Sequence, residues 1–199
     1  LAVIITLLQL FTCSLAAFAF TKLHFPGRDK IFVAYLATMM VPWHAIMIPQ
    51  FIVVKAFGMY NTHLSLIVLQ AFSAFGVFLL RQNMLSIPDS LHEAAKIDGC
   101  STFGIYRKII LPLSQNGLAT LTVLTFNSVW NDYMGPMIYL DSDRLKTIQL
   151  GLASFQQQFS ADYGAIMAGT VCSVIPIIIV YCIGQKYIVE GVAFAGVKG

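Results

Sequence analysis

The sequence predicts an all-α protein that crosses a membrane several times. Hydrophobic residues make up 58% of the 199 residues and charged residues only 11%, against about 25% charged residues in an ordinary soluble domain. The apolar residues fall into five separate runs, and Lys and Arg fall mainly into alternate loops beside these runs. Together these observations predict a polytopic membrane helical bundle that forms one domain.

Each of the five runs is low in charge and roughly 17–24 residues long. About 20 helical residues cross a hydrocarbon core of about 30 Å, so each run predicts one span. The alternative, a buried helix of a large soluble protein, is disfavoured by five runs in succession. The first run has no basic segment before it, which favours a span over a signal peptide. The runs are residues 1–20, 31–54, 64–80, 117–140 and 165–184.

Lys and Arg are divided unevenly between the two sides of the predicted bundle. Nine follow the first, third and fifth runs, and three follow the second and fourth. Positive charge collects on cytoplasmic loops, so the chain is expected to begin outside and to end in the cytoplasm. The nine are Lys22, Arg28, Lys30, Arg81, Lys96, Arg107, Lys108, Lys186 and Lys198, and the three are Lys55, Arg144 and Lys146.

Prolines and cysteines add two local expectations. Pro42 and Pro49 lie inside the second run, and each removes a helical hydrogen bond, so this span is expected to kink or break near its outer end. The four cysteines have neither Cys-x-x-Cys nor zinc spacing, and three of them lie in apolar runs. Unbridged thiols are therefore expected, and no metal site.

The largest cytoplasmic segment, residues 82–116, is expected to form a helix–turn–helix elbow at the membrane surface. Pro88 and the pattern Ser90-x-x-Glu93 predict a helix that begins near residue 89 or 90 and stops at Gly99. A second helix is expected to begin near residue 101 or 102 and to end before Pro112.

The elbow has the features of a docking element. Ala94 and Ala95 are small enough to allow close approach to another surface, and Glu93 suits the start of a helix. Gly99 permits the positive φ that reverses the chain. The elbow is suited to a groove on a cytoplasmic protein, and a helix resting on lipid is the alternative. The second helix adds an apolar stripe at helical spacing, which consists of Phe103, Tyr106 and Ile110.

The sequence lacks the features of an ATPase and of an enzyme. A phosphate-binding loop needs Gly-x4-Gly-Lys-Ser/Thr. Gly99 and Gly104 have this glycine spacing but are followed by Ile105 and Tyr106. Any ATP-driven action therefore requires a partner that binds the ATP, and the chain itself is expected to need no cofactor and to be no enzyme.

Residues 93–112 resemble the EAA signature of inner-membrane permeases of ABC importers. The signature reads Glu-Ala-Ala, three residues, Gly, nine residues and Ile-x-Leu-Pro, and every fixed position matches. Other motifs resemble the carbohydrate branch, specifically its smaller maltose-permease-type subunit, although Cys100 stands where that branch often has Ala. These motifs are Phe-Pro-Gly-Arg at 25–28, Ile-Asp-Gly at 97–99, Trp-Asn-Asp at 130–132, Gln-Lys-Tyr at 185–187 and Gly-Val-Lys-Gly at 196–199.

The resemblance implies a fold and a set of partners. It implies the transmembrane domain of a type I ABC importer, with residues 1–199 supplying five of six spans and one span expected before Leu1. It also implies a bacterial inner membrane, a heterodimer with a second permease subunit, an ABC ATPase dimer and an external sugar-binding protein. ATPase closure would move the elbows and switch the spans between inward-facing and outward-facing states. The residues expected to act in this coupling are Glu93, Ala94, Ala95, Asp98, Gly99, Phe103, Tyr106, Ile109, Leu111 and Pro112.

Polar residues in the fourth run indicate a translocation path. An Asp near the centre of a span costs ~2.5–3.5 kcal/mol in lipid, so these side chains are expected to face a protein interior or a wet cavity. Trp130 has two open interpretations, a sugar contact or helix packing. The path residues are Asn127, Trp130, Asn131 and Asp132. The resemblance also implies that the external loop reaches the binding protein, and its expected contacts are Asp141, Asp143, Gln156, Gln157 and Gln158.

The sequence leaves other functions open. The same architecture importing glycerol phosphate or another small solute is the first alternative, because the sugar-branch motifs do not exclude a sugar phosphate. A membrane-embedded enzyme is a remote alternative, since Asp132 is the only acid inside a run. A secondary transporter usually needs several intramembrane polar sites and would leave the elbow without a role.

Overall fold

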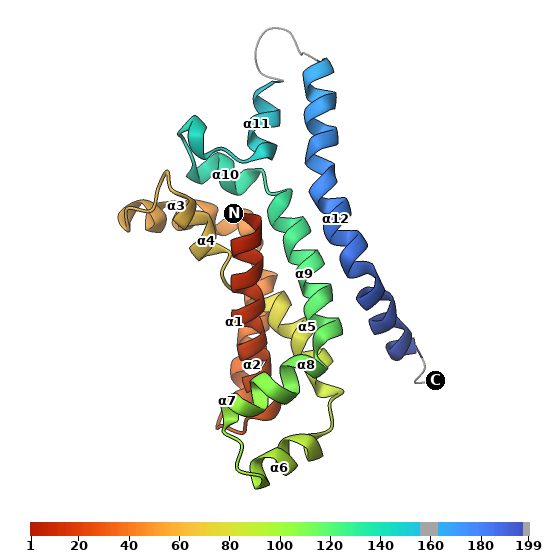
Figure 1. Cartoon of the computed structure of the whole chain (residues 1–199). Coiled ribbons are helices and arrows are strands. Elements are labelled where there is room, and N and C mark those ends of the chain that lie inside the picture. The colour runs from red at the N-terminus through yellow and green to blue at the C-terminus, as the bar shows by residue number, and fades with distance from the viewer. Residues whose placement is uncertain (156–162, 197–199) are drawn as a thin grey trace.

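The computed structural model describes residues 1–155 and 163–196, and every regular element in these residues is helical (Figure 1). The all-α fold class is therefore confirmed. The longer helices are α1 (Ala2–Lys22), α2 (Arg28–Ala37), α3 (Trp43–Ala56), α5 (Ala74–Leu85), α6 (Asp89–Ile97), α9 (Gln115–Trp130) and α12 (Tyr163–Gly196). The shorter helices are η1 (Thr38–Met40), α4 (His63–Leu69), α7 (Thr102–Ile105), η2 (Tyr106–Ile110), α8 (Leu111–Leu113), α10 (Met134–Tyr139), η3 (Asp143–Leu145) and α11 (Ile148–Ser154).

The centre of the molecule is the packing of α1 against α5 and α9. Cys13 and Leu121 meet in the core beside Gly76, where an added Cβ would lie 2.9 Å from the Cys13 Sγ. Small residues allow helices to approach closely, which favours helix association in a membrane. Helix α12 packs along α9 and leaves most of its described side chains exposed.

Two helices, α1 and α12, are long and apolar enough to cross a membrane unbroken. Three further pairs pass the same test only as bent pairs, which gives up to five spans in the described residues. The pair Arg28–Met40 and Trp43–Ala56 bends by 98°, the pair His63–Leu69 and Ala74–Leu85 by 43°, and the pair Thr102–Leu113 and Gln115–Trp130 by 77°. The first and fifth predicted runs thus form unbroken helices, and the second and third form bent pairs. The remaining bent pair joins the elbow segment to α9 at residue 114, before the fourth predicted run begins.

Proline explains one bend, as the sequence predicts. The chain leaves the helical conformation at Val41 and Pro42, and α3 begins directly afterwards with Pro42 as its N-cap. The break lies near the middle of the apolar run and not at its outer end. Pro49 lies inside α3 without ending it.

The expectation of one unbroken fourth span over residues 117–140 is wrong. Helix α9 ends at Trp130, and Asn131 and Asp132 lie in a short break before α10. The Asp132 Oδ1 accepts a hydrogen bond from the backbone N–H of Gly135 at 3.1 Å. The carboxylate thereby satisfies a donor at the start of the next helix, which favours a new helix over continuation of α9.

Helix α6 lies at one end of the bundle, and α10 and α11 lie at the other end (Figure 1). Helix α1 starts toward the α10 end and runs toward α6, and α12 runs in the same direction. The elbow and the pair α10 and α11 therefore lie at opposite ends of the spanning helices, as the distribution of Lys and Arg predicts.

Candidate functional site

The elbow consists of α6, the turn at residues 98–101 and the helical segment that begins with α7. The turn has the predicted geometry, because Gly99 has φ +79° and the Ser101 hydroxyl accepts from the Gly104 N–H at 3.1 Å. The predicted capping box of Ser90 and Glu93 is absent, since α6 begins earlier, after Pro88.

The second helix of the elbow continues through Pro112, so the expectation that it ends before this residue is wrong. Residues 106–110 form a π-helical turn, in which the Leu111 N–H donates to the Tyr106 carbonyl. The wider turn shifts the hydrogen-bond register just before Pro112, and the proline then lies in the first turn of α8. A proline is tolerated there because its missing N–H is not needed.

The elbow has one face toward its own bundle and one face toward the outside. Ala95, Ile105, Tyr106 and Ile110 are buried in the core shared with α1. The predicted stripe of Phe103, Tyr106 and Ile110 therefore does not form one surface, because only Phe103 is exposed. Ile109 and Leu111 are half-buried, and the exposed members of the signature are Glu93, Ala94, Asp98, Gly99 and Pro112.

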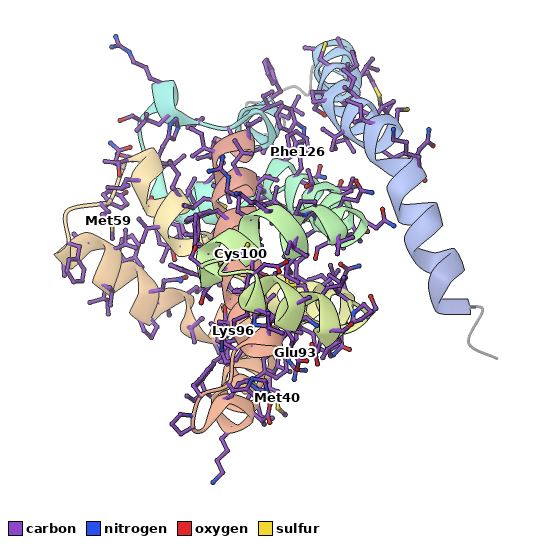
Figure 2. All side chains as sticks on the ribbon, turned by 60° about the horizontal axis from the view of Figure 1, so that its bottom comes forward. Met40, Met59, Glu93, Lys96, Cys100 and Phe126 are labelled. Atoms are coloured by element: carbon purple, nitrogen blue, oxygen red, sulfur yellow. The ribbon has the colours of Figure 1, made fainter. Side chains whose placement is uncertain are left out.

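Figure 2 shows this end of the molecule, with Glu93, Lys96 and Cys100 toward the viewer. Large apolar side chains surround these polar residues. Leu91 is 43% exposed, Ile97 86% and Phe103 57%. A face that mixes exposed apolar and charged side chains is typical of a docking surface.

Helix α1 holds the elbow in place through buried polar contacts. The Lys22 ammonium donates to the Ile87 carbonyl and to the Asp89 carboxylate, each at 2.6 Å, and its side chain is only 2% exposed. The Tyr106 hydroxyl lies 2.8 Å from the Ser14 hydroxyl. The hydrogen bond and charge of Lys22 hold the pKa of Asp89 below its usual range. Sequence reasoning treated Lys22 only as a topology signal and missed this role.

A cavity of about 700 Å³ lies between the spanning helices toward their other end. Its size is within the range of small-molecule sites. Five elements supply its polar and aromatic lining. Helix α1 supplies Gln9, and α3 supplies Trp43, His44 and Gln50. The α4–α5 pair and its break supply Gln70, Phe72, Ser73 and Phe75. Helix α9 supplies Thr125 and Ser128, and α10 with the break before it supplies Asp132 and Tyr139.

The break between α4 and α5 exposes backbone carbonyls to this cavity region. Gln9 donates to the Gln70 carbonyl at 2.7 Å, and Thr12 donates to the Ala71 carbonyl at 2.7 Å. The Cys13 thiol lies 3.5 Å from the Ser73 carbonyl. Irregular backbone is tolerated at membrane depth only where protein or water satisfies it. Side chains of α1 supply these partners.

Two hydrogen-bonded groups converge on the cavity. The Gln70 Nε2 donates to the Asp132 Oδ2 at 2.9 Å, which joins the break after α4 to the break after α9. The Gln50 Oε1 accepts from the Trp43 Nε1 at 2.9 Å and from the Tyr139 hydroxyl at 3.0 Å. Both amides are thus fixed in orientation, and the Gln50 Nε2 keeps its N–H donors for a ligand.

Of the four predicted path residues, only Asp132 lines the cavity. Asn131 donates to the Asn127 carbonyl at 2.9 Å, and both residues are exposed elsewhere. The Trp130 ring stacks on Phe126, and its N–H donates to the Ser173 carbonyl of α12 at 2.9 Å. Trp130 therefore takes part in helix packing. The sequence analysis missed the glutamines at positions 9, 50 and 70, although each is a polar residue in an apolar run.

The loop after α10 carries the first two predicted binding-protein contacts. Asp141 and Asp143 are exposed, and Asp143 pairs with Lys146 at 2.6 Å, which lowers the pKa of its carboxyl group. The Asn61 side chain accepts from the backbone N–H groups of Asp141 and Ser142. The other predicted contacts, Gln156, Gln157 and Gln158, lie outside the described residues.

A bundle of spanning helices with a polar cavity and an exposed helix–turn–helix at one end defines the membrane subunit of a transport system. The chain belongs to the family of binding-protein-dependent transport system inner membrane components, whose model matches residues 9–193. It has the helical fold of the permeases of ABC importers.

Two named relatives and one solved structure carry this likeness. The arabinooligosaccharides transport system permease protein AraQ of Halalkalibacterium halodurans is 32% identical over 199 residues, covering 100% of this chain and 71% of the relative. The lactose transport system permease protein LacG of Rhizobium radiobacter is 34% identical over 191 residues, covering 96% and 70%. A crystal structure of a bacterial ABC transporter involved in import of the acidic polysaccharide alginate matches with a TM-score of 0.84 and 29% identity, covering 94% of this chain and 71% of that chain.

Proposed function

We propose that this chain is a permease subunit of an ATP-driven importer of carbohydrate. The supporting observation is a pair of features joined by one helix: an exposed elbow at one end and a polar cavity toward the other, with α1 in contact with both. The relatives named for arabinooligosaccharide and lactose transport favour a carbohydrate. The Gln50 amide is fixed beside Trp43 and Tyr139, an arrangement that suits the hydroxyl groups and the apolar faces of a sugar ring.

The remaining subunits of the importer are part of the same proposal. The elbow would dock into an ABC ATPase through Glu93, Ala94, Asp98, Gly99 and Phe103, all of which are exposed. A second permease subunit would complete the translocation path, and the loop with Asp141 and Asp143 would face a sugar-binding protein. ATP would be bound and hydrolysed by the ATPase dimer, since the chain lacks a phosphate-binding loop.

The orientation proposed from the positive-inside rule places α6 and the end of α12 in the cytoplasm of a bacterial cell. A single-Cys variant at Ser142, which is exposed in the loop after α10, should react with a membrane-impermeant thiol reagent in intact cells or spheroplasts. The matched variant at Ser101, exposed in the elbow, should react only after lysis. The reverse pattern would invert the orientation.

Reconstitution tests the function as a whole. The chain purified alone should hydrolyse no ATP. Assembled with its second permease and its ATPase dimer in proteoliposomes, it should support ATP hydrolysis that rises when sugar-loaded binding protein is added. Hydrolysis that ignores loaded binding protein, in a complex that assembles normally, would contradict the proposal.

A further inference from the structure

The charge of the cavity narrows the substrate class. Carbohydrates that importers of this type handle can be neutral, as arabinooligosaccharides and lactose are, or acidic, as alginate is. Resting on the proposed function, we propose that this cavity takes neutral carbohydrate and rejects acidic or phosphorylated sugars, with Asp132 and Gln70 as the pair that sets this choice.

The cavity carries a carboxylate with no opposing Lys or Arg among the described residues that line it. Asp132 is half-buried there, and its two recorded contacts are hydrogen bonds from the Gln70 amide and the Gly135 backbone N–H. Neither contact neutralises the charge. Among the described lining residues, His44 is the only one that can carry a positive charge, and its ring packs edge-on to Trp43.

This arrangement suits hydroxyl groups. Each carboxylate oxygen accepts about two hydrogen bonds, so the single bond that each Asp132 oxygen accepts leaves room for sugar hydroxyl donors. Gln50 adds amide N–H donors for hydroxyl oxygens at the other side of the cavity. Hydrogen bonds that involve a charged group are stronger than neutral ones, so a hydroxyl gains more from a carboxylate than from an amide.

The same carboxylate disfavours an anionic substrate. Two like charges in a cavity with low-dielectric walls repel more strongly than in water, and the described lining holds no Lys or Arg that compensates. A uronate or sugar phosphate would leave both anions without a Lys or Arg partner among the described lining residues. Specificity of this kind arises from the repelled competitor as well as from the favoured ligand.

The first measurement reads the electrostatic potential of the cavity without any sugar. Ser128 lines the cavity and is exposed, whereas its neighbour Asn127 is exposed outside it. Single-Cys variants at these two positions, made in the assembled importer after replacement of the four native cysteines, are treated with cationic and anionic methanethiosulfonate reagents. The ratio of cationic to anionic rates should be higher at 128 than at 127 by about tenfold, the scale of one nearby charge.

Substitutions of the ionisable lining residues test which side chain raises the ratio of cationic to anionic rates at 128. Asp132→Asn keeps the acceptor for the Gly135 N–H and should remove most of the difference, while His44→Gln should leave it in place. A ratio at 128 that is unchanged by Asp132→Asn would overturn the assignment of the charge. This measurement stands even if the chain imports something other than carbohydrate.

The second measurement uses matched sugars as protecting ligands for the Cys at 128. The alditols of lactose, maltotriose and arabinotriose are each compared with the corresponding aldonic acid, which has the same open-chain end and carries a carboxylate in place of the C1 hydroxymethyl group. At least one neutral sugar should slow modification at concentrations where its acid has at least tenfold less effect, and Asp132→Asn should narrow this gap. The proposal would be overturned if the acids protected the Cys at 128 as well as the neutral sugars do. It would also be overturned if no compound of either class protected it.

Discussion

Helix α1 holds its neighbours in different ways at the cavity and at the elbow. At the cavity, Gln9 and Thr12 donate to backbone carbonyls that the break between α4 and α5 leaves without helical partners. At the elbow, the Lys22 ammonium and the Tyr106 hydroxyl connect α1 to a separate helix pair. The first set of contacts stabilises a broken span, and the second fastens the docking element to the bundle.

An unbroken helix thus connects two irregular regions. Helix α1 runs from Ala2 to Lys22 without interruption, whereas the α2–α3 pair bends by 98° and the α4–α5 pair by 43°. A displacement of the elbow is therefore expected to reach the cavity through α1.

Replacing Gly99 with Val is expected to abolish uptake. Gly99 has φ +79°, a conformation that a β-branched residue adopts only at a cost of about 1–3 kcal/mol, so the turn between α6 and α7 must change. Gly58 is the matched control, because it has φ +68° in the turn after α3 and, like Gly99, has no atom within 4 Å of an added Cβ. Uptake assays should show a severe loss for Gly99→Val alone. Equal losses from Gly58→Val would indicate general destabilisation.

Replacing Lys22 with Met is expected to uncouple hydrolysis from transport. The substitution keeps the apolar stem but leaves the buried Ile87 carbonyl without a donor, a cost of about 1–3 kcal/mol at the start of α6. Uptake should fall several-fold while the assembled complex retains most of its ATPase activity. Lys146→Met is the control, since it removes only the exposed pair with Asp143. A proportional loss of uptake and hydrolysis would assign Lys22 a purely structural role.

These contacts also mark what sequence patterns predict and what they miss. The helix–turn–helix and the positive φ of Gly99 follow from local rules, because a helix stop and a chain reversal depend on neighbouring residues. The five apolar runs follow from length and composition. By contrast, no local rule predicts the contact between Asp132 and Gln70, because these residues lie 62 positions apart in the sequence.

The residues of the candidate site were likewise predicted only in part from sequence patterns. Asp132 was identified because a charge in an apolar run is costly, and it lines the cavity. Asn127 and Asn131 were identified because polar side chains are also costly in an apolar run, but these two residues bond to each other on an exposed face. The helical period alone does not reveal which face of α9 meets α5 and which meets solvent or lipid, because the neighbouring spans decide it.

The two tryptophans should respond differently to substitution. Trp43 lines the cavity and fixes the Gln50 amide, so Trp43→Phe removes a hydrogen bond worth about 0.5–1.5 kcal/mol and should raise the apparent KM for uptake by about threefold to tenfold. Trp130→Phe removes a bond to the Ser173 carbonyl of α12 and should leave the KM unchanged. A raised KM for Trp130→Phe with no change for Trp43→Phe would restore Trp130 to the translocation path.

The smallest effect is expected from the carboxylate of Asp89. The hydrogen bond from Lys22 and its charge lower the pKa of Asp89 in the folded protein. Its contribution to stability is therefore fully present above the unfolded pKa of about 3.9, and it is lost as pH falls through the lowered folded pKa. The Asp89 side chain is 76% exposed, so solvent screening limits this contribution to no more than about 0.5 kcal/mol.

Thermal melts of the solubilised complex between pH 7 and pH 3 measure this contribution. Asp89→Asn should lower the melting temperature slightly at pH 7, and the difference from the wild type should shrink toward pH 3, where the carboxylate begins to protonate. In a Lys22→Met background the same substitution should change nothing at either pH, because the donor is already absent. A difference that persists at full size at pH 3, or that survives without Lys22, would mean that Asp89 stabilises the start of α6 through the helix dipole and not through its bond to α1.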